Sequence, residues 1–380
     1  MADHFKRIGD YISVIDNRNT DGSISKLMGI SIDKCYIPSV ANVIGTDLNN
    51  YKVIHKGQFA CSLMQVSRDQ RIPIAMFRDG NPAIMSPAYV MFEVTRPDEL
   101  MPEYMELWFM RSEFDREASF YAVGGVRGSL DWEDFCNMRL PAPPIDEQRE
   151  IVHDYQVITD RISLLQKEKE HLIELIKNTY KHVFNLDNYP MVSMSQICSK
   201  IGSGATPKGG KDSYYSEGIS LIRSTNVYDY FFSFEELAHI NDEQADALSN
   251  VIVEPYDVLF NITGVSIARC CIVPNSVLPA RVNQHVMILR PYAGKYMSYY
   301  LMITLCEQSN KNLLLGIGQA GSTREAINKQ EMEAFKIPLP DSDAINLFGA
   351  NTDACFRQIH NAILQTENLL SIRNAIISQL

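Results

Sequence analysis

The chain has 380 residues and a formal net charge of −11, with 46% hydrophobic and 21% charged residues. This composition is that of an ordinary globular protein, and the length predicts two or three domains that each bury a core. The acidic balance argues against a protein that coats nucleic acid on its own.

The eight cysteines are scattered without a Cys-x-x-Cys pair, which indicates buried thiols in a reducing compartment. The first residues contain no apolar run suited to a signal peptide, and no window approaches the roughly 18 apolar residues of a transmembrane helix. We therefore expect a cytoplasmic protein that makes no contact with a membrane.

Two segments share one plan of short strands followed by helices. Residues 1–143 contain β-rich runs such as YISVID and FACSLMQV, then one long helix after Pro102 and a second helix from Asp131 to about Asn137. Residues 188–341 contain the runs ISLIR, VLFNIT and HVMILR, followed by the helical run KYMSYYLMITLCEQS. We predict an α+β fold with two similar domains, each built on a small, partly antiparallel sheet.

A long helix follows each domain, over residues 144–187 and 342–380. Apolar residues recur at spacings of four and three, which is the heptad pattern of a coiled coil. Because each helix alone would expose an apolar stripe, we predict that the two pack as an antiparallel intramolecular coiled coil of roughly 50 Å. The residues that we assign to the coiled coil and to partner docking are Ile151, Tyr155, Ile158, Ile162, Leu165, Leu172, Ile176, Ile359, Leu369 and Ile376.

The sequence contains an internal repeat. Segments 124–183 and 321–380 show the same order of elements 197 residues apart and without a gap, so that Arg127 corresponds to Arg324. Few residues are identical, and the repeat therefore lies in the order of elements. A chain of this kind carries two similar recognition surfaces, one in each domain.

The motifs of several enzyme classes are absent from the sequence. There is no Gly-x-x-x-x-Gly-Lys-Ser/Thr phosphate loop, no Gly-x-Ser-x-Gly elbow and no Cys/His cluster suited to a metal. Asn81-Pro-Ala-Ile84 lacks the second proline and the aromatic residue of an amino-methyltransferase motif. Residues 316–321 match Gly-x-Gly-x-x-Gly, but no alternating strand–helix pattern follows them. We expect no catalytic residue, metal or cofactor in this chain.

Polar and cationic loops at equivalent places in the two domains are candidates for DNA contact. Glycines let backbone N–H groups approach a phosphate, and arginine adds charge or reads a guanine edge. Tight turns with solvated side chains explain the same residues nearly as well. The candidates are Arg18, Asn19, Lys26, Arg127, Ser129, Ser203, Thr206, Lys208, Lys211, Arg223, Asn226, Thr323 and Arg324.

Three runs of residues resemble those of specificity subunits of type I restriction–modification systems. They are Leu140-Pro-Ala-Pro-Pro-Ile-Asp-Glu-Gln-Arg-Glu-Ile151, Ile337-Pro-Leu-Pro-Asp341 and Ser203-Gly-Ala-Thr-Pro207. The second copy has Ala344-Ile345 in place of Glu147-Gln148, and the first domain has Arg18-Asn19 in place of the Ser-Gly-x-Thr-Pro run. These departures suggest that the two domains read different DNA sequences.

The resemblance implies a non-catalytic subunit of a phage-defence system. In this family two target recognition domains, here 1–143 and 188–341, each bind one half of a split, asymmetric site on double-stranded DNA. The helices 144–187 and 342–380 set the gap between the halves and dock two methyltransferase subunits, which carry S-adenosylmethionine and methylate adenine. Motor-nuclease subunits can join them. The partners would share the phosphate contacts, which eases the objection raised by the net charge.

Two alternatives stay open at this point. In one, the chain is the recognition partner of a fused methyltransferase–nuclease. In the other, it is an adaptor whose coiled coil organises proteins and whose domains never touch DNA. The DNA affinity of the assembled complex separates the adaptor from the two recognition functions.

Overall fold

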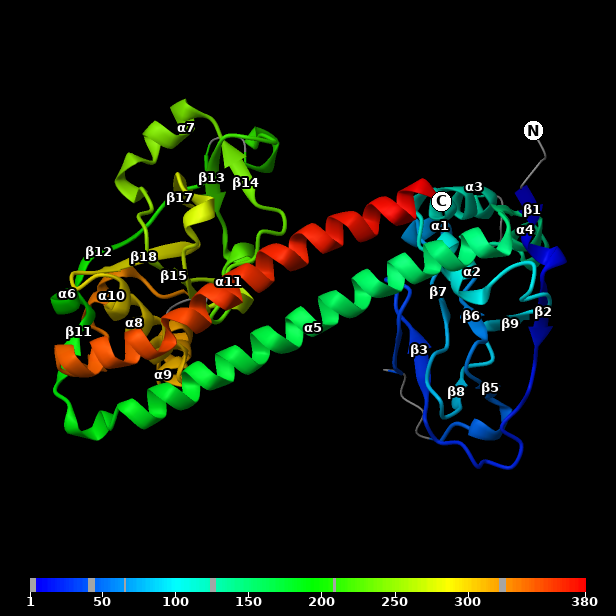
Figure 1. Cartoon of the computed structure of the whole chain (residues 1–380), viewed down its shortest axis with the longest axis horizontal. Helices are drawn as coiled ribbons and strands as arrows, with labels where there is room; N and C mark the ends of the chain where they lie inside the picture. The colour runs from blue at the N-terminus through cyan, green and yellow to red at the C-terminus, as the bar shows by residue number, and fades with distance from the viewer. Residues whose placement is uncertain (1–4, 40–44, 65, 124–127, 208–209, 321–325) are drawn as a thin grey trace. The chain divides into compact units, whose positions relative to one another are not determined.

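The computed structural model describes residues 5–39, 45–64, 66–123, 128–207, 210–320 and 326–380. The chain divides into two compact units. Unit 1 comprises Met1–Arg161 and Leu369–Leu380, and unit 2 comprises Ile162–Asn368. The long helices α5 (Ile145–Val183) and α11 (Ser342–Gln379) each contribute residues to both units (Figure 1).

Unit 1 is built on an antiparallel sheet of four strands, in the order β2 (Ile12–Ile15), β9 (Val90–Val94), β6 (Phe59–Cys61) and β7 (Ile74–Met76). Its strand pairs are β1 (Phe5–Arg7) with β10 (Arg139–Pro141), β3 (Met28–Ile30) with β4 (Tyr36–Pro38), and β5 (Lys52–Ile54) with β8 (Ala83–Met85). Its shorter helices are α1 (Val66–Asp69), α2 (Pro102–Phe109), α3 (Ser112–Ala122) and α4 (Trp132–Asn137).

An aromatic core joins the sheet of unit 1 to its helices. Phe59 stacks on Phe92 with ring centroids 5.1 Å apart, and Phe109 of α2 meets both rings edge-on. Edge-to-face and offset contacts of this kind add to the stabilisation that burial alone provides. Pro102 begins α2, where its fixed φ and missing N–H suit the first turn of a helix.

Unit 2 has a four-stranded antiparallel sheet in the order β12 (Cys198–Ser203), β18 (Val286–Pro291), β15 (Val258–Asn261) and β16 (Cys270–Ile272). A second sheet has the order β14 (Ala238–Ile240), β13 (Ile219–Ile222) and β17 (Ala280–Val282), and β11 (Met191–Ser193) pairs with β19 (Lys336–Pro338). The shorter helices are α6 (Met194–Ile197), α7 (Asp242–Ala247), α8 (Lys295–Cys306), α9 (Gln308–Ala320) and α10 (Lys329–Ala334).

Short 3-10 helices connect these elements in both units. They are η1 (Ile8–Asp10), η2 (Leu48–Asn50), η4 (Leu186–Asn188), η5 (Gly210–Ser213), η6 (Ser224–Asn226), η7 (Ser249–Val251), η8 (Gly264–Ser266) and η9 (Asn275–Val277). Within the described ranges, no helix is long and apolar enough to cross a membrane.

The structure confirms the internal repeat and the α+β fold. Both four-stranded sheets have the same order: first strand, last strand, then the hairpin between them. The helix α4 and its counterpart α10 begin at Trp132 and Lys329, which is the offset of the sequence repeat, and β10 and β19 and the starts of α5 and α11 keep the same offset. A backbone hydrogen bond also recurs, since the N–H of Leu130 donates to Leu63 O and that of Ile327 donates to Ile262 O, both at 2.9 Å.

The helix expected after Pro102 is two helices in the structure. The chain turns at Arg111, whose extended backbone (ψ 142°) separates α2 from α3. The same break separates α8 from α9 at Glu307 (ψ 137°). The turn is favoured because it lets α3 bury Phe114, Ala118 and Ala122 in the core of unit 1, which a straight helix would carry past it.

In each unit, the start of one long helix lies near the end of the other. In unit 2, the end of α5 meets the start of α11, where the rings of Tyr180 and Phe184 lie 5.9 and 5.3 Å from that of Phe348. In unit 1, Ile151 near the start of α5 packs into the same core as Leu380 at the end of the chain. Both contacts fit the antiparallel pairing expected from the heptads.

Candidate nucleic-acid interface

The Ser-Gly-Ala-Thr-Pro run at 203–207 lies tightly against the sheets of unit 2. A Cβ atom on Gly204 would stand 1.8 Å from the carbonyl oxygen of Val282, so no larger residue fits. The N–H of Gly204 donates to Asn283 O at 3.1 Å. The motif therefore needs its glycine because the loop must approach the end of β17 closely.

A chain of side-chain hydrogen bonds starts at this loop. The Thr206 hydroxyl donates to Gln284 Oε1, and Gln284 Nε2 lies 2.9 Å from His285 Nε2. His285 Nδ1 in turn lies 2.6 Å from the Thr263 hydroxyl. We call these four residues the polar chain. Thr206 and Gln284 are exposed, whereas His285 and Thr263 are half-buried. The side-chain amide of Gln284 is therefore held in place at the surface.

Backbone contacts bring the segments of the polar chain together. Asn261 pairs with Val286 at the junction of β15 and β18, and the N–H of Ile262 donates to His285 O at 3.0 Å. Thr263 forms an isolated β-bridge to Ala326, which precedes α10. The three loops that carry Thr206, Thr263 and Gln284 therefore meet at one end of the four-stranded sheet.

The three segments that carry the polar chain contain no carboxylate. Residues 203–207, 261–269 and 283–287 contain neither Asp nor Glu, although the chain has 46 acidic residues. Val265 in η8 is fully exposed, and the Arg269 guanidinium lies 4.9 Å from the centre of the Tyr228 ring. These three segments therefore bring no carboxylate of their own against phosphates or base edges.

The structure corrects the expectation for two asparagines. Asn19 is 2% exposed, and its amide exchanges hydrogen bonds with the backbone N–H and carbonyl of Ile24. Asn226 is fully buried, accepts from the N–H of Arg223 at 3.0 Å and donates to Ser233 O at 3.1 Å. Both amides stabilise their own loops, since buried polar groups must be hydrogen-bonded, and neither is exposed for DNA.

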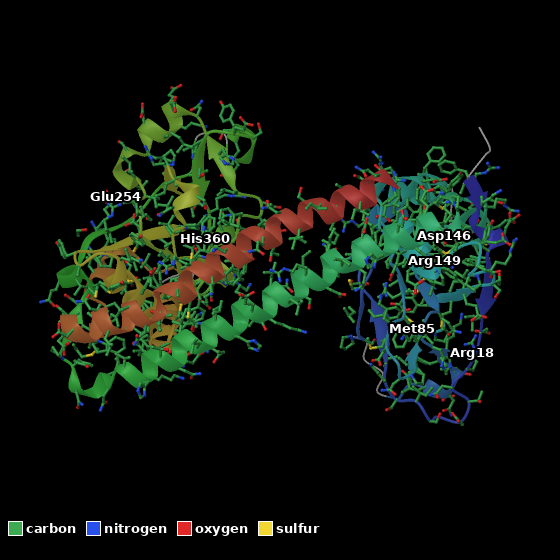
Figure 2. All side chains as sticks on the ribbon, viewed as in Figure 1. Arg18, Met85, Asp146, Arg149, Glu254 and His360 are labelled. Atoms are coloured by element: carbon green, nitrogen blue, oxygen red, sulfur yellow. The ribbon has the colours of Figure 1, made fainter. Side chains whose placement is uncertain are left out.

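Two cationic candidates of unit 1 are exposed but paired with carboxylates. Arg18, labelled in Figure 2, lies 2.7 Å from an oxygen of Asp16, and its hydrogen bond lowers the pKa of that carboxyl. Lys26 forms an ion pair with Asp79. A phosphate at either position would have to compete with the carboxylate, so both cations contribute less than isolated ones would.

The other described candidates have mixed surroundings. Arg223 is largely buried, lies 3.8 Å from the carboxylate of Glu236 and stacks over Tyr214. Ser203 is half-buried at the end of β12, and Ser129 is half-buried in unit 1. Arg127, Lys208, Thr323 and Arg324 lie outside the described residues, and for Lys211 the structure describes the backbone in η5.

Sequence reasoning missed Gln284, His285 and Thr263. A signal was present, because Asn283-Gln284-His285 directly precedes the strand that begins at Val286, and a strand end is a common place for binding residues. Nothing in one sequence, however, shows that this strand end meets the Thr206 loop, because Thr206 and Gln284 are far apart in the chain.

The motif at the start of α5 holds the helix to unit 1. Gln148 is fully buried; it accepts from Met101 N–H at 2.9 Å and donates to Glu99 O and Pro143 O at 2.9 and 2.8 Å. Asp146 and Arg149 form an exposed ion pair on the other side (Figure 2).

The second copy of the motif fixes its helix by apolar contacts instead. Ile345, the counterpart of Gln148 in the repeat, is 8% exposed and packs into the core of unit 2. The departure from Glu-Gln to Ala-Ile therefore replaces hydrogen bonds with apolar burial.

The residues assigned to the coiled coil and to docking fall into two groups. Ile162, Leu165, Ile176 and Ile359 are at most 6% exposed and belong to the interior of unit 2. The half-buried residues are Ile151, Tyr155, Ile158, Leu172, Leu369 and Ile376. The second group retains surface that a partner can cover.

Comparison with known proteins shows what the chain is similar to. The model of the type I restriction modification DNA specificity domain matches residues 187–364. This part of the chain is therefore similar to specificity domains. The resemblance to type I specificity subunits that the sequence motifs carry is thereby confirmed.

Two further proteins are similar to the chain. The type I restriction enzyme MjaX specificity subunit of Methanocaldococcus jannaschii is 22% identical over 156 residues, which cover 40% of this chain and only 36% of that relative. The crystal structure of a type I restriction-modification S subunit from M. genitalium is 12% identical, with a TM-score of 0.61 over 98% of this chain and 94% of that one. The second match shows a shared fold along nearly the whole chain.

Proposed function

We propose that this chain is the DNA-recognition subunit of a type I restriction–modification complex. Each unit reads one half of a bipartite, asymmetric site on double-stranded DNA, and the chain itself performs no catalysis. The observation that carries the proposal is the repeat: residues 187–364 match a specificity domain, and unit 1 has the same strand order. Two recognition surfaces in one chain suit a site in two parts.

The polar chain supplies the means of base recognition in unit 2. Its hydrogen bonds occupy one position each on Gln284 Oε1 and Nε2, and each atom keeps a second position for a ligand. A glutamine amide that donates and accepts side by side matches the N7 and N6 edge of adenine in the major groove. The fixed amide therefore favours an adenine in the second half-site.

The partners supply the catalysis and part of the phosphate contacts. Two methyltransferase subunits, which carry S-adenosylmethionine, dock on this chain and methylate adenine in each half, and motor-nuclease subunits complete the restriction enzyme. Because the chain has a net charge of −11 and Arg18 and Lys26 are paired, we expect weak DNA binding alone and salt-sensitive, tight binding in the complex.

A methylome tests the proposal directly. The chain is expressed with the methyltransferase encoded beside it in a host that lacks adenine methylation, and modified adenines are mapped by long-read sequencing. We expect a split motif with methyl-adenine in both halves that disappears when this chain is omitted. A soluble, co-purifying complex that methylates nothing would favour the adaptor function instead.

Two variants assign the halves of the motif. Gln284→Ala should relax or change the second half of the methylated motif only, whereas Gln330→Ala, at an exposed site on α10, should leave the motif intact.

Replacing both Arg127 and Arg324 with alanine should weaken DNA binding of the assembled complex. Unchanged affinity would remove the role of these two loops, with Arg116→Ala as the control at an exposed arginine.

A further inference from the structure

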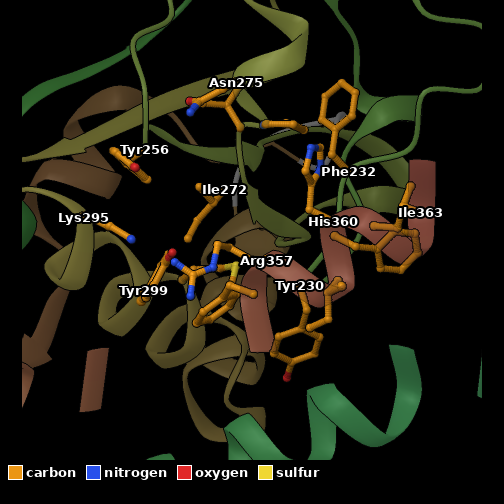
Figure 3. A pocket seen from close by; sticks show the side chains of 16 residues that line it. Tyr230, Phe232, Tyr256, Ile272, Asn275, Lys295, Tyr299, Arg357, His360 and Ile363 are labelled. Carbon is orange, nitrogen blue, oxygen red and sulfur yellow. The ribbon is translucent and has the colours of Figure 1, made fainter. Parts of the chain in front are cut away.

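A groove crosses unit 2 between its edge strand and the helix α11. It encloses about 320 Å³ and is bounded by the end of β16, by α8, by α11 and by the loop at 230–232 (Figure 3). We call it groove 2. In Figure 3, Lys295, Tyr299 and Arg357 lie at one end, and Phe232, His360 and Ile363 lie at the other. The groove thus has a polar, cationic end and an apolar end.

The cationic end is organised by one carboxylate. Asp353 is 9% exposed and accepts hydrogen bonds from the Tyr299 hydroxyl at 2.9 Å and from Lys295, and it lies 2.8 Å from an Arg357 nitrogen. Two cations therefore share one carboxylate, and the Arg357 side chain remains 68% exposed. Arg357 is held in place and keeps N–H donors for another carboxylate.

Two tyrosines in the walls of groove 2 have strained backbones. Tyr230 and Tyr256 adopt φ angles of 72° and 69°, in the left-handed region that bulky residues rarely occupy. Strain of this kind persists where the surrounding structure imposes it and often accompanies binding sites. Burial also lowers the pKa of His360, so its ring is neutral near pH 7 and adds to the apolar end.

Unit 1 has a groove at the equivalent place in the repeat. This groove, groove 1, encloses about 490 Å³ and is bounded by the end of the edge strand β7, by α2, by α5 and by the β3–β4 hairpin. The edge strand β7 corresponds to β16, the helix α2 to α8, and α5 to α11. Thr159 lines groove 1, and its counterpart in the repeat, Phe356, lines groove 2.

The two grooves also share one chemical feature. In groove 1, Arg78 is 55% exposed, and one of its nitrogens is bound by Glu106, whose side chain is 9% exposed. The pair corresponds in kind to Arg357 with Asp353, although the residues come from different elements. Each groove therefore presents an exposed arginine that a buried carboxylate positions, beside an apolar cavity.

From this repetition we infer that the two grooves are equivalent docking sites for the same segment of two identical partner subunits. The segment places an apolar side chain in the cavity and a carboxylate against Arg78 or Arg357. Two copies of one surface on a single chain call for two copies of one partner, and the methyltransferase is the partner that the proposed function supplies twice. The identity of the partner therefore rests on the proposed function.

Charge reversal at the two arginines tests the inference by stoichiometry. The full chain is purified with the methyltransferase encoded beside it, and native mass spectrometry counts the subunits bound. We expect two methyltransferases on the wild-type chain, one on Arg78→Glu, one on Arg357→Glu and none on the double variant. Arg116→Glu and Lys329→Glu, at exposed cations that also have carboxylate partners, should keep two.

A second pair of variants fills the grooves and leaves the ion pairs in place, so that loss of a subunit does not depend on breaking an ion pair that also stabilises the fold. Cys35→Trp and Asn275→Trp place a large side chain at exposed positions that line groove 1 and groove 2 without touching the ion pairs, and each should also lose one subunit. Two subunits on every variant, or loss of both from a single substitution, would overturn the inference. A wild-type complex that binds two subunits but methylates no split motif would refute the proposed function and leave the docking sites standing.

Discussion

Replacing Gln148 with leucine should destabilise unit 1 by about 3 kcal/mol. The substitution keeps the approximate volume of the side chain but removes its hydrogen bonds to Met101 N–H, Glu99 O and Pro143 O. Each backbone group left unsatisfied in a buried site costs about 1–3 kcal/mol, and water that enters the site recovers part of this. Three such groups at the lower end of the range give the expected total.

Urea unfolding followed by tryptophan fluorescence measures this loss selectively. The two tryptophans of the chain, Trp108 and Trp132, both lie in unit 1, so the signal reports on the unit that contains Gln148. The matched control is Gln156→Leu at an exposed position on α5 within unit 1, where we expect a change within about 0.5 kcal/mol. If Gln148→Leu costs less than about 1 kcal/mol, the buried amide does not anchor the helix and the reasoning fails.

Three further outcomes follow from the structure. Gly204→Ala forces a Cβ onto the carbonyl of Val282 and should degrade the second half of the methylated motif, whereas Gly202→Ala meets ordinary contacts and should not; equal motifs from both would contradict the close approach. Burial raises the pKa of Asp353, but its three donors lower that pKa by more, so the net shift is downward. The contribution of Asp353 to stability is therefore present above pH 3.8 and is lost as the pH falls through the lowered pKa. The difference in unfolding free energy between wild type and Asp353→Asn should shrink below about pH 4, and a constant difference would contradict this prediction. Deletion of residues 162–168, one heptad of α5, should change the gap of the methylated motif, and an unaltered gap would refute the role of the helix as a spacer.

The order of elements was readable from the sequence because its signals are local. Heptad spacing, prolines after a strand and a helix run at a constant offset depend on neighbours a few residues away. The predicted repeat is therefore present with a constant offset, from α4 to the start of α5 in the first copy and from α10 to the start of α11 in the second. The break between α2 and α3 was missed, since Met110 and Arg111 carry no breaker residue and the turn is favoured by the burial of Phe114 in the core.

The roles of the polar residues were decided by the tertiary structure. Asn19 and Asn226 looked like surface residues in polar loops, yet their amides bind backbone groups of those loops and lie buried. Gln284 attracted no attention in the sequence, yet it is the exposed amide that Thr206 and His285 hold in place.

The sequence by itself determined that this protein is a repeated α+β chain with two heptad helices and the motifs of a specificity subunit. Only the tertiary structure decided which polar side chains face outward and that each unit carries a groove beside its long helix. The physical reason is that periodic burial depends on local spacing, whereas the partner of a hydrogen bond or the wall of a groove comes from residues far away in the chain.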